Sequence, residues 1–295
     1  MRDITERGVR AAQLGILVNA LLAAIKLLAG VVGNSYVLIA DAIESGTDIF
    51  SSLVVMGGLM IARREPTDEF PFGYGRAETL ASAVVAILLI GAAIGISVEA
   101  IREIQTPHQL PAAWTLVVLV VAVVVKWILS RRVQFVGAEI DSKAVQADAW
   151  HHLSDALTSL AAFVGISVAL AGGPGWEAAD DWAALVAAGI IAFNGVAILR
   201  AALRDLMDAA PEGEIVARIR EIAQAVPGVL AIEKLIVRRA GLVYHVTIHV
   251  QASPSMPLSD SHALGGRVRA AIRDAIPQSG LVVVHMEPFD ATARQ

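Results

Sequence analysis

The sequence contains no cysteine, few charged residues and few aromatic residues. The absence of cysteine excludes disulfide bonds and thiolate ligands, so any metal site must use nitrogen and oxygen donors. Charged residues make up 17% of the chain, whereas roughly 25% is usual for soluble domains. The net charge of -5 comes without a basic block of the kind that nucleic-acid-binding proteins carry. These absences argue against a soluble protein and against a nucleic-acid partner.

Hydrophobic residues, by contrast, make up 56% of the chain. They gather in stretches that are long enough to cross a bilayer, which takes about 20 apolar residues. We expect six membrane helices, over residues 12–32, 36–62, 77–101, 112–130, 144–171 and 181–203. The charged N-terminal segment runs into the first stretch without a credible cleavage site, so we expect a retained first helix and not a signal peptide.

The basic residues predict how these helices are oriented. The connections at 33–35, 105–111 and 172–180 contain no lysine or arginine, whereas the connections on the opposite side contain several. Arg102, near the outer end of the third helix, is the exception to this trend. The positive-inside rule therefore places both termini in the cytoplasm. We expect an integral protein of a bacterial inner membrane.

Two polar signatures interrupt the apolar stretches. Glu44 and Asp48 lie four residues apart in the second stretch, and His151 and Asp155 lie four residues apart in the fifth. This spacing places each pair on one face of its helix. Ionisable groups are costly inside a membrane, and three carboxylates with one imidazole form a natural ligand set for a divalent transition metal. The alternative is a structural hydrogen-bond network, which would bury three carboxylates without a cation.

Other polar residues in these stretches have structural explanations. Lys26 and Asp41 flank the first connection at similar distances, where an ion pair would lower the cost of burying both, and a transport role is the alternative. Asp148, one turn before His151, either orients that imidazole or faces a polar vestibule. His152 points about 100° away from His151, so we expect a hydrogen-bonded neighbour and not a ligand.

The chain changes character after residue 208. From that point the periodicity of apolar residues predicts a helix, a hairpin with its turn at Ala240 and Gly241, a second helix and a last strand. The corresponding ranges are 212–226, 230–239, 242–252, 259–276 and 281–289. We therefore expect a six-helix transmembrane transport domain over 1–208 and a small cytoplasmic α+β domain over 209–295 that gains stability from dimerisation.

These features resemble the cation diffusion facilitator family over nearly the whole chain. The segment LIADAIESGTDIFSS is similar to the family's second helix, ADAWHHLSDALTS to its fifth helix, and PTDEFPFGYGRAETL to the cytoplasmic stretch before its third helix. The resemblance implies six membrane helices and a ferredoxin-like α-β-β-α-β domain. It also implies that Glu44, Asp48, His151 and Asp155 bind the transported metal. Position 44 more often holds Asp or His in the family, and the longer Glu changes the reach of the ligand.

The resemblance further implies a homodimer in the lipid bilayer that exports a divalent cation by alternating access in exchange for protons. Because metal ligands must be deprotonated, metal and protons compete for the same groups. We expect Zn²⁺ or Fe²⁺ as substrate, with Mn²⁺, Co²⁺ and Cd²⁺ as alternatives, and neither an organic cofactor nor enzymatic activity. The rival functions are a metal-gated channel or metal-sensing receptor, and a membrane enzyme that uses metal-bound water.

In the C-terminal unit, the resemblance places regulatory metal ligands at His249, His262, His285 and Glu287, with Glu233 at a further ligand position. His285 and Glu287 share one face of the last strand by alternation, as His245 and His249 do on theirs. The alternative is that these histidines are structural. A metal-binding cluster would make this domain a metal sensor as well as a dimerisation domain.

The loop before the third helix departs from relatives that carry histidines there, because Phe70 and Tyr74 stand at the matching positions. We therefore expect no ion in this loop. Arg76 matches a basic position that pairs in the family with an acidic residue after the sixth helix, here Asp208. The alternative is an ordinary surface pair worth less than about 1 kcal/mol.

Overall fold

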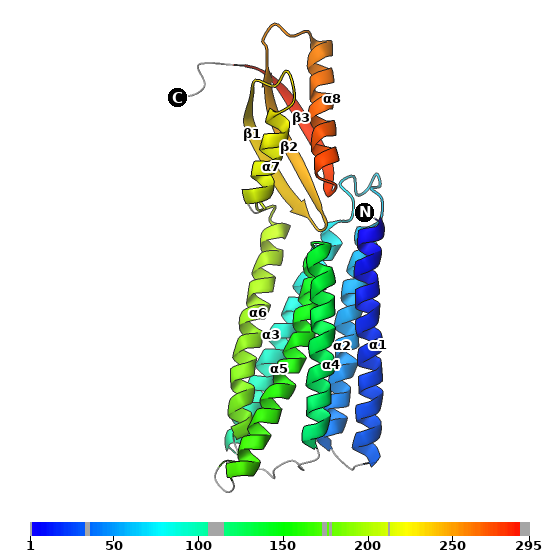
Figure 1. Ribbon diagram of the computed structural model, residues 1–295, viewed down its shortest axis with the longest axis vertical. Coiled ribbons are helices and arrows are strands. Elements are labelled where there is room, and N and C mark those ends of the chain that lie inside the picture. Colours follow the sequence, from blue (N-terminus) through cyan, green and yellow to red (C-terminus); the bar gives the residue numbers. More distant parts are fainter. Residues whose placement is uncertain are drawn as a thin grey trace. The chain divides into compact units, whose positions relative to one another are not determined.

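The computed structural model describes residues 2–32, 36–105, 115–172, 176, 179–211 and 213–289, without the side chains of 2–5, 29–32, 36–44, 46, 47, 115, 158, 162, 166, 169, 170 and 180. Within this part of the chain, six long helices precede a small unit of two helices and three strands (Figure 1). The long helices are α1 (Arg2–Val32), α2 (Tyr36–Ala62), α3 (Arg76–Gln105), α4 (Thr115–Glu139), α5 (Lys143–Gly172) and α6 (Ala179–Leu206). The fold class predicted from the sequence is confirmed.

Several helices extend beyond the apolar stretches that predicted them. Helix α1 begins at Arg2 and α4 ends at Glu139, because a helix satisfies its backbone hydrogen bonds internally and does not stop where the hydrocarbon does. By length and composition, three segments of the described chain are able to span a membrane: Glu6–Leu28, Arg76–Gln105 and Asp181–Leu206. Helix α2 contributes a shorter apolar segment, Asp48–Ala62.

Helices α1, α2, α4 and α5 pack side by side, with α1 and α5 each against both α2 and α4 (Figure 1). Small residues allow α3 to approach both α2 and α6 closely. A Cβ added at Gly58 of α2 would lie 2.5 Å from the Cβ of Ala81 in α3. One added at Gly195 of α6 would lie 2.9 Å from Cγ1 of Ile90 in α3. This packing brings α2, α4 and α5 close enough to share one polar site.

A buried glutamate holds the start of α5 in place. Glu78 of α3 is 1% exposed, and its Oε1 accepts hydrogen bonds of 2.8 Å from the Ser142 hydroxyl and from the Ala144 N–H. The first N–H groups of a helix have no partner within the helix, so a carboxylate there satisfies them. Glu78 thereby fixes the end of α5 that leads to Asp148 and His151.

The chain divides into two compact units. One comprises Arg2–Arg63 and Ala77–Ala202, and the other comprises the polar segment Arg64–Arg76 together with Leu203–Gln295. The loop before α3 thus belongs with the C-terminal residues by its contacts. The boundary that we place at residue 208 from composition stays a prediction.

The C-terminal unit has the predicted order of elements. It consists of α7 (Gly213–Gln224), β1 (Ala231–Ala240), β2 (Val243–Ala252), α8 (Leu258–Ala275) and β3 (Ser279–Pro288). The sheet order is β1-β2-β3, with β1 and β2 antiparallel and β2 and β3 parallel. Gly241 adopts a φ of 62° at the hairpin turn, a conformation that glycine reaches without steric cost. The core includes Ile219, Ile248, Leu264, Val268 and Ile272.

Candidate metal centres

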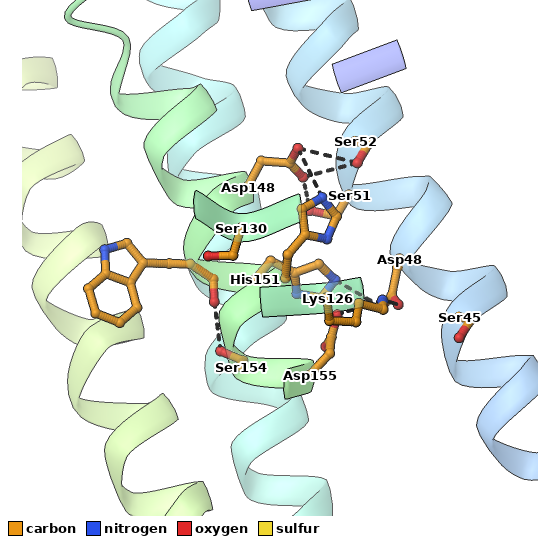
Figure 2. A network of polar contacts seen from close by, with 12 residues as sticks. Ser45, Asp48, Ser51, Ser52, Lys126, Ser130, Asp148, His151, Ser154 and Asp155 are labelled. Carbon is orange, nitrogen blue, oxygen red and sulfur yellow. Dashed lines mark hydrogen bonds and ion pairs between the residues drawn. The ribbon is translucent and has the colours of Figure 1, made fainter. Parts of the chain in front are cut away.

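Three of the four residues predicted to bind the transported metal lie together inside the helical unit. Asp48 comes from α2, and His151 and Asp155 come from consecutive turns of α5. One ligand atom from each lies within 4.8 Å of the others. His151 Nε2 and Asp48 Oδ1 are 3.1 Å apart, and Figure 2 shows these side chains directed toward one another. Glu44 lies on α2 one turn before Asp48, but its side chain is outside the described part of the chain.

Lys126 of α4 completes the cluster, and the sequence analysis missed it. Its Nζ bonds to Asp48 Oδ2 and, at 2.9 Å, to Asp155 Oδ2 (Figure 2). The Lys126 side chain is only 2% exposed. A lone charge inside an apolar run is the signal that would have found it, because such a group must face a protein interior and a partner.

The charges of the cluster, as well as its geometry, are compatible with a bound cation. Asp48 and Asp155 are 3% and 13% exposed at their side chains, and removing carboxylates from water is costly without a nearby positive charge. The Lys126 ammonium supplies that charge between the two carboxylates. The Nδ1 atom of His151 is buried without a hydrogen bond in the described part of the chain. Oxygen donors and one imidazole suit a divalent transition metal.

A second polar group lies one turn away along α2 and α5. Asp148 accepts hydrogen bonds from the hydroxyls of Ser51, at 3.3 Å, and Ser52, at 3.1 Å (Figure 2). Its Oδ2 lies 3.6 Å from Nε2 of His152. Asp148, Ser51 and Ser52 are all 0% exposed, so these contacts form a buried hydrogen-bond network, and both roles of Asp148 stay predictions. His152 is fully buried beside Asp148, but neither of its ring nitrogens has a hydrogen bond within the described part of the chain, so the hydrogen bond that we predict for it is not seen there.

The other residues singled out from the sequence lie outside the two polar groups described above. Lys26 is buried and donates a hydrogen bond of 3.0 Å to the Ser45 hydroxyl, while the side chain of its predicted partner Asp41 is outside the described part of the chain. Phe70 and Tyr74 contact each other with ring centroids 4.7 Å apart. The expectation of an ion-free loop stays a prediction.

The predicted pair of Arg76 and Asp208 is present, with a third member. Arg238 of β1 donates a hydrogen bond of 3.0 Å to Asp208 Oδ2, and Arg76 bonds to Oδ1. Although burial acts in the opposite direction, the hydrogen bonds from both arginines lower the pKa of the Asp208 carboxyl. Arg238 also stacks over the Phe72 ring, with its Cζ 5.2 Å from the ring centroid. The carboxylate therefore links the end of α6, the loop before α3 and β1.

A second candidate metal centre lies on the three-stranded sheet. Register pairs His249 of β2 with His285 of β3, and Gln251 with Glu287. Ligand atoms of His249, His285 and Glu287 lie within 4.8 Å of one another, and His249 Nδ1 is 2.7 Å from Glu287 Oε1. The hydrogen bond with His249 lowers the pKa of the Glu287 carboxyl. These groups form a surface site in which a cation would meet two imidazoles and a carboxylate.

Glu233 joins this surface through an irregularity in β1. The register of β1 on β2 shifts between Ile232 and Lys234, and such a bulge breaks the alternation of side chains. Both Glu233 and Lys234 are consequently exposed. Glu233 Oε2 lies 3.4 Å from His249 Nδ1, close enough to join a shared ligand set.

His262 is separated from this group within one chain. It is exposed on α8, which packs on the sheet face that carries Val284 and Met286. His249 and His285 alternate with the core residues and so point to the opposite face. The sheet therefore lies between His262 and the cluster. A role for His262 in a shared site would require a second copy of the chain.

Comparison with known proteins adds independent information. A model of the cation efflux transmembrane domain matches residues 12–207, and a model of the cation efflux protein cytoplasmic domain matches residues 211–289. Similar proteins include the magnetosome protein MamB of Magnetospirillum gryphiswaldense, which is 30% identical over 89% of this chain and 88% of the relative. The manganese efflux system protein MneP of Bacillus subtilis is 27% identical over 95% of this chain and 96% of the relative.

A third relative and one solved structure complete the comparison. The cation-efflux pump FieF of Citrobacter koseri is 30% identical over 97% of this chain and 94% of the relative. The similar solved structures include MamM-CTD 215-293, which is 25% identical, covers 26% of this chain and 96% of that chain, and has a TM-score of 0.26. The sequence matches thus span both compact units.

Proposed function

Because the chain belongs to the cation efflux, or cation diffusion facilitator, family, we propose that it exports a divalent metal cation from the cytoplasm as a proton-coupled homodimeric antiporter. The observation that carries this proposal is the buried cluster of Asp48, His151 and Asp155, whose ligand atoms lie within 4.8 Å of one another. A purely structural network would not need to bring two carboxylates and an imidazole to one point in an apolar bundle. Glu44 is the proposed fourth ligand.

In this proposal Lys126 is a tethered counter-ion of the empty site. Its ammonium lies between Asp48 and Asp155, where a divalent cation would need to bind the same oxygens. Metal and ammonium therefore exclude each other from the carboxylates. Metal entry moves the Lys126 head group aside, and metal release lets it return and restore the charge balance of the buried site.

The donor set favours Zn²⁺ or Fe²⁺ as the exported metal. One imidazole among carboxylates is a borderline set, softer than the oxygen-only shells that Mg²⁺ and Ca²⁺ prefer. Mn²⁺ is the main competitor, since the relative MneP is named as a manganese efflux system protein. Competition between these metals for uptake into vesicles identifies the substrate.

Exchange with protons follows from ligand chemistry. His151 and the carboxylates must be deprotonated to hold the metal, so protons arriving from outside favour its release. The positive-inside rule places both termini in the cytoplasm, on the side where the basic residues gather. In a homodimer, alternating access would expose the cluster first to that side and then to the other.

The sheet cluster is the proposed regulatory site. His249, His285 and Glu287 bring together elements that are far apart in the sequence, with Glu233 at their edge. A metal that binds the folded, dimeric form stabilises it by mass action. It shifts transport only by the difference in its affinity for the two arrangements of the dimer.

Reconstituted vesicles test the transport proposal. The wild-type chain should accumulate Zn²⁺ or Fe²⁺ saturably when an imposed pH gradient drives it, and Asp48→Ala or Asp155→Ala should abolish accumulation while leaving a folded dimer. Asp274→Ala removes an exposed carboxylate of α8 and serves as the matched control. Downhill movement alone would favour a metal-gated channel, and wild-type transport by either variant would remove that residue from the site.

A further inference from the structure

A cavity of about 660 Å³ lies between α1 and α4, at the ends of these helices that carry arginines. The two helices are neighbours in the bundle (Figure 1). The charged residues of the lining are four arginines, Arg7, Arg10, Arg131 and Arg132. This cavity is separate from both candidate metal centres, and its charge is of the wrong sign for a cation.

Among the residues whose side chains the structure describes, two carboxylates bond to these four arginines. Arg7 bonds through both terminal nitrogens to the carboxylate of Glu139. Arg10 lies 3.6 Å from Glu6, and both of these side chains are more than half exposed. Arg131 lies over the Trp127 ring, with its Cζ 5.7 Å from the centroid. An anion that enters the cavity can meet Arg131 and Arg132 of α4, whose side chains leave the helix about 100° apart, and Arg10 of α1.

Apolar residues form a wall of the cavity before and after the arginines along α4, and some of them lie further from the basic ends of the helices. Along α4, Trp127 stands one helical turn before Arg131, about 6 Å further from the basic end. On α1, Leu14 stands one turn beyond Arg10 in the same direction and also lines the cavity. Trp127 is 48% exposed and Ile128 is 46% exposed. A ligand that fills the cavity needs an anionic head at the arginines and an apolar tail beside Trp127.

We propose that this cavity binds an anionic phospholipid of the cytoplasmic leaflet. A planar guanidinium group, as in Arg131 or Arg132, is able to bind two phosphate oxygens at once. Basic pockets between membrane helices suit lipid head groups, and tryptophan favours the depth where head group and acyl chain meet. A free phosphate would use the arginines but leave the apolar wall uncovered. The combination selects a lipid.

The location gives the lipid a physical connection to transport. Trp127 is adjacent in sequence to Lys126 on α4. One side of α4 therefore lines the cavity through Trp127, and another side carries the Lys126 ammonium that bonds to the metal cluster. A bound lipid also joins α1 to α4. An effect on metal export would require that the two arrangements of these helices bind the lipid with different affinity.

Quenching of tryptophan fluorescence measures this binding on the full-length protein. The chain has five tryptophans, and the signal lost in Trp127→Phe isolates the contribution of Trp127. Phosphatidylglycerol with brominated acyl chains should quench this contribution at a lower fraction of lipid than brominated phosphatidylcholine does. Inorganic phosphate at the same concentration should not displace it.

Paired variants separate the cavity from general surface charge. Arg131→Gln with Arg132→Gln should weaken binding of phosphatidylglycerol roughly 30-fold, at about 1 kcal/mol for each arginine. Arg63→Gln with Arg64→Gln removes two consecutive exposed arginines outside the cavity and should leave the affinity within about twofold. If the first pair fails to fold, Arg10→Gln, at an exposed side chain, should still cause a loss of roughly fivefold.

Three results would overturn the proposal. Equal quenching by both lipids would show that the cavity does not distinguish an anionic head group. Equal loss in the two double variants would assign the effect to diffuse positive charge. Displacement of the lipid by inorganic phosphate at the same concentration would mean that the cavity recognises a free anion, with no contribution from the apolar wall.

Discussion

Replacement of Lys126 by methionine tests whether the empty transport site depends on a tethered cation. Methionine keeps most of the length and apolar volume of the lysine stem but removes the ammonium that bonds to Asp48 and Asp155. Two buried carboxylates then lack their counter-ion. The variant should therefore be less stable than wild type when chelator keeps metal away, and the loss should disappear as metal fills the site.

The size of the effect follows from the contacts. Breaking a buried ion pair by removing one partner costs about 3 to 5 kcal/mol. Asp48 keeps its contact with His151 at 3.1 Å, and the Asp155 side chain is 13% exposed, so water and imidazole offset part of the cost. We expect about 3 kcal/mol, which lowers the melting temperature by roughly 6 to 12 °C for a domain of this size.

The assay is thermal unfolding of the full-length protein in detergent, with chelator and with added Zn²⁺. Lys126→Met should gain more from Zn²⁺ than wild type does, because no ammonium competes for the carboxylates. Lys126→Arg keeps the charge and should lose less stability in chelator. Lys143→Met makes the same change at the start of α5, outside the cluster, and should respond to Zn²⁺ as wild type does.

A double substitution makes this test sharper. Asp155→Asn added to Lys126→Met removes the charge left behind, and the double variant should recover part of the stability lost in chelator. Wild-type stability of Lys126→Met in chelator would refute the role of the ammonium. An equal Zn²⁺-induced shift in Lys126→Met and wild type would refute the competition between ammonium and metal.

Three further predictions concern other groups. His151→Asp should shift selectivity toward Mn²⁺ and change the pH profile of uptake, since a carboxylate is a harder ligand than an imidazole and binds protons less strongly; an unchanged profile and selectivity in vesicles would remove His151 from the ligands. The fragment 209–295 should dimerise and melt at a higher temperature with Zn²⁺, and His249→Ala or His285→Ala should remove that shift; calorimetry without zinc binding to the unaltered fragment would make these histidines structural. The hydrogen bonds from the arginines lower the pKa of Asp208, so they add stability above about pH 4 that is lost as pH falls through the lowered pKa. Asp208→Asn should therefore show a weaker dependence of the melting temperature on acid pH than wild type does. If the variant and wild type give the same curve of melting temperature against pH, these bonds add no stability.

The sequence predicts the order of the elements because each carries a clear local pattern. Long apolar runs predict α1 to α6, and the switch to helical and alternating periods after residue 208 predicts the C-terminal unit. Helix ends are less predictable. The hydrocarbon boundary limits the apolar residues but not the backbone hydrogen bonds, so α1 and α4 continue into charged segments.

The sequence predicts only those residues of the candidate metal centres that lie close to one another along the chain. The pairs of Glu44 with Asp48 and of His151 with Asp155 follow from helical spacing. Lys126 has no such partner on its own helix, and its bonds to α2 and α5 exist only after the helices pack. Glu233 is similar, because the register shift in β1 that exposes it depends on pairing with β2.

The two candidate centres differ in the feature that separates transport from sensing. A sensor only has to bind, and the sheet cluster keeps its ligands near solvent, with the His285 side chain 61% exposed. A transporter must also release its cargo, which buried carboxylates alone would oppose. In the proposed mechanism, the bonds of the Lys126 ammonium to Asp48 and Asp155 lower the net affinity for metal, since metal has to displace the ammonium first. It also supplies the replacement charge at release, so the site never has to face the membrane interior with bare carboxylates. The proposed transport site of this chain therefore depends on a competing cation within the protein, whereas the proposed regulatory site on the sheet does not.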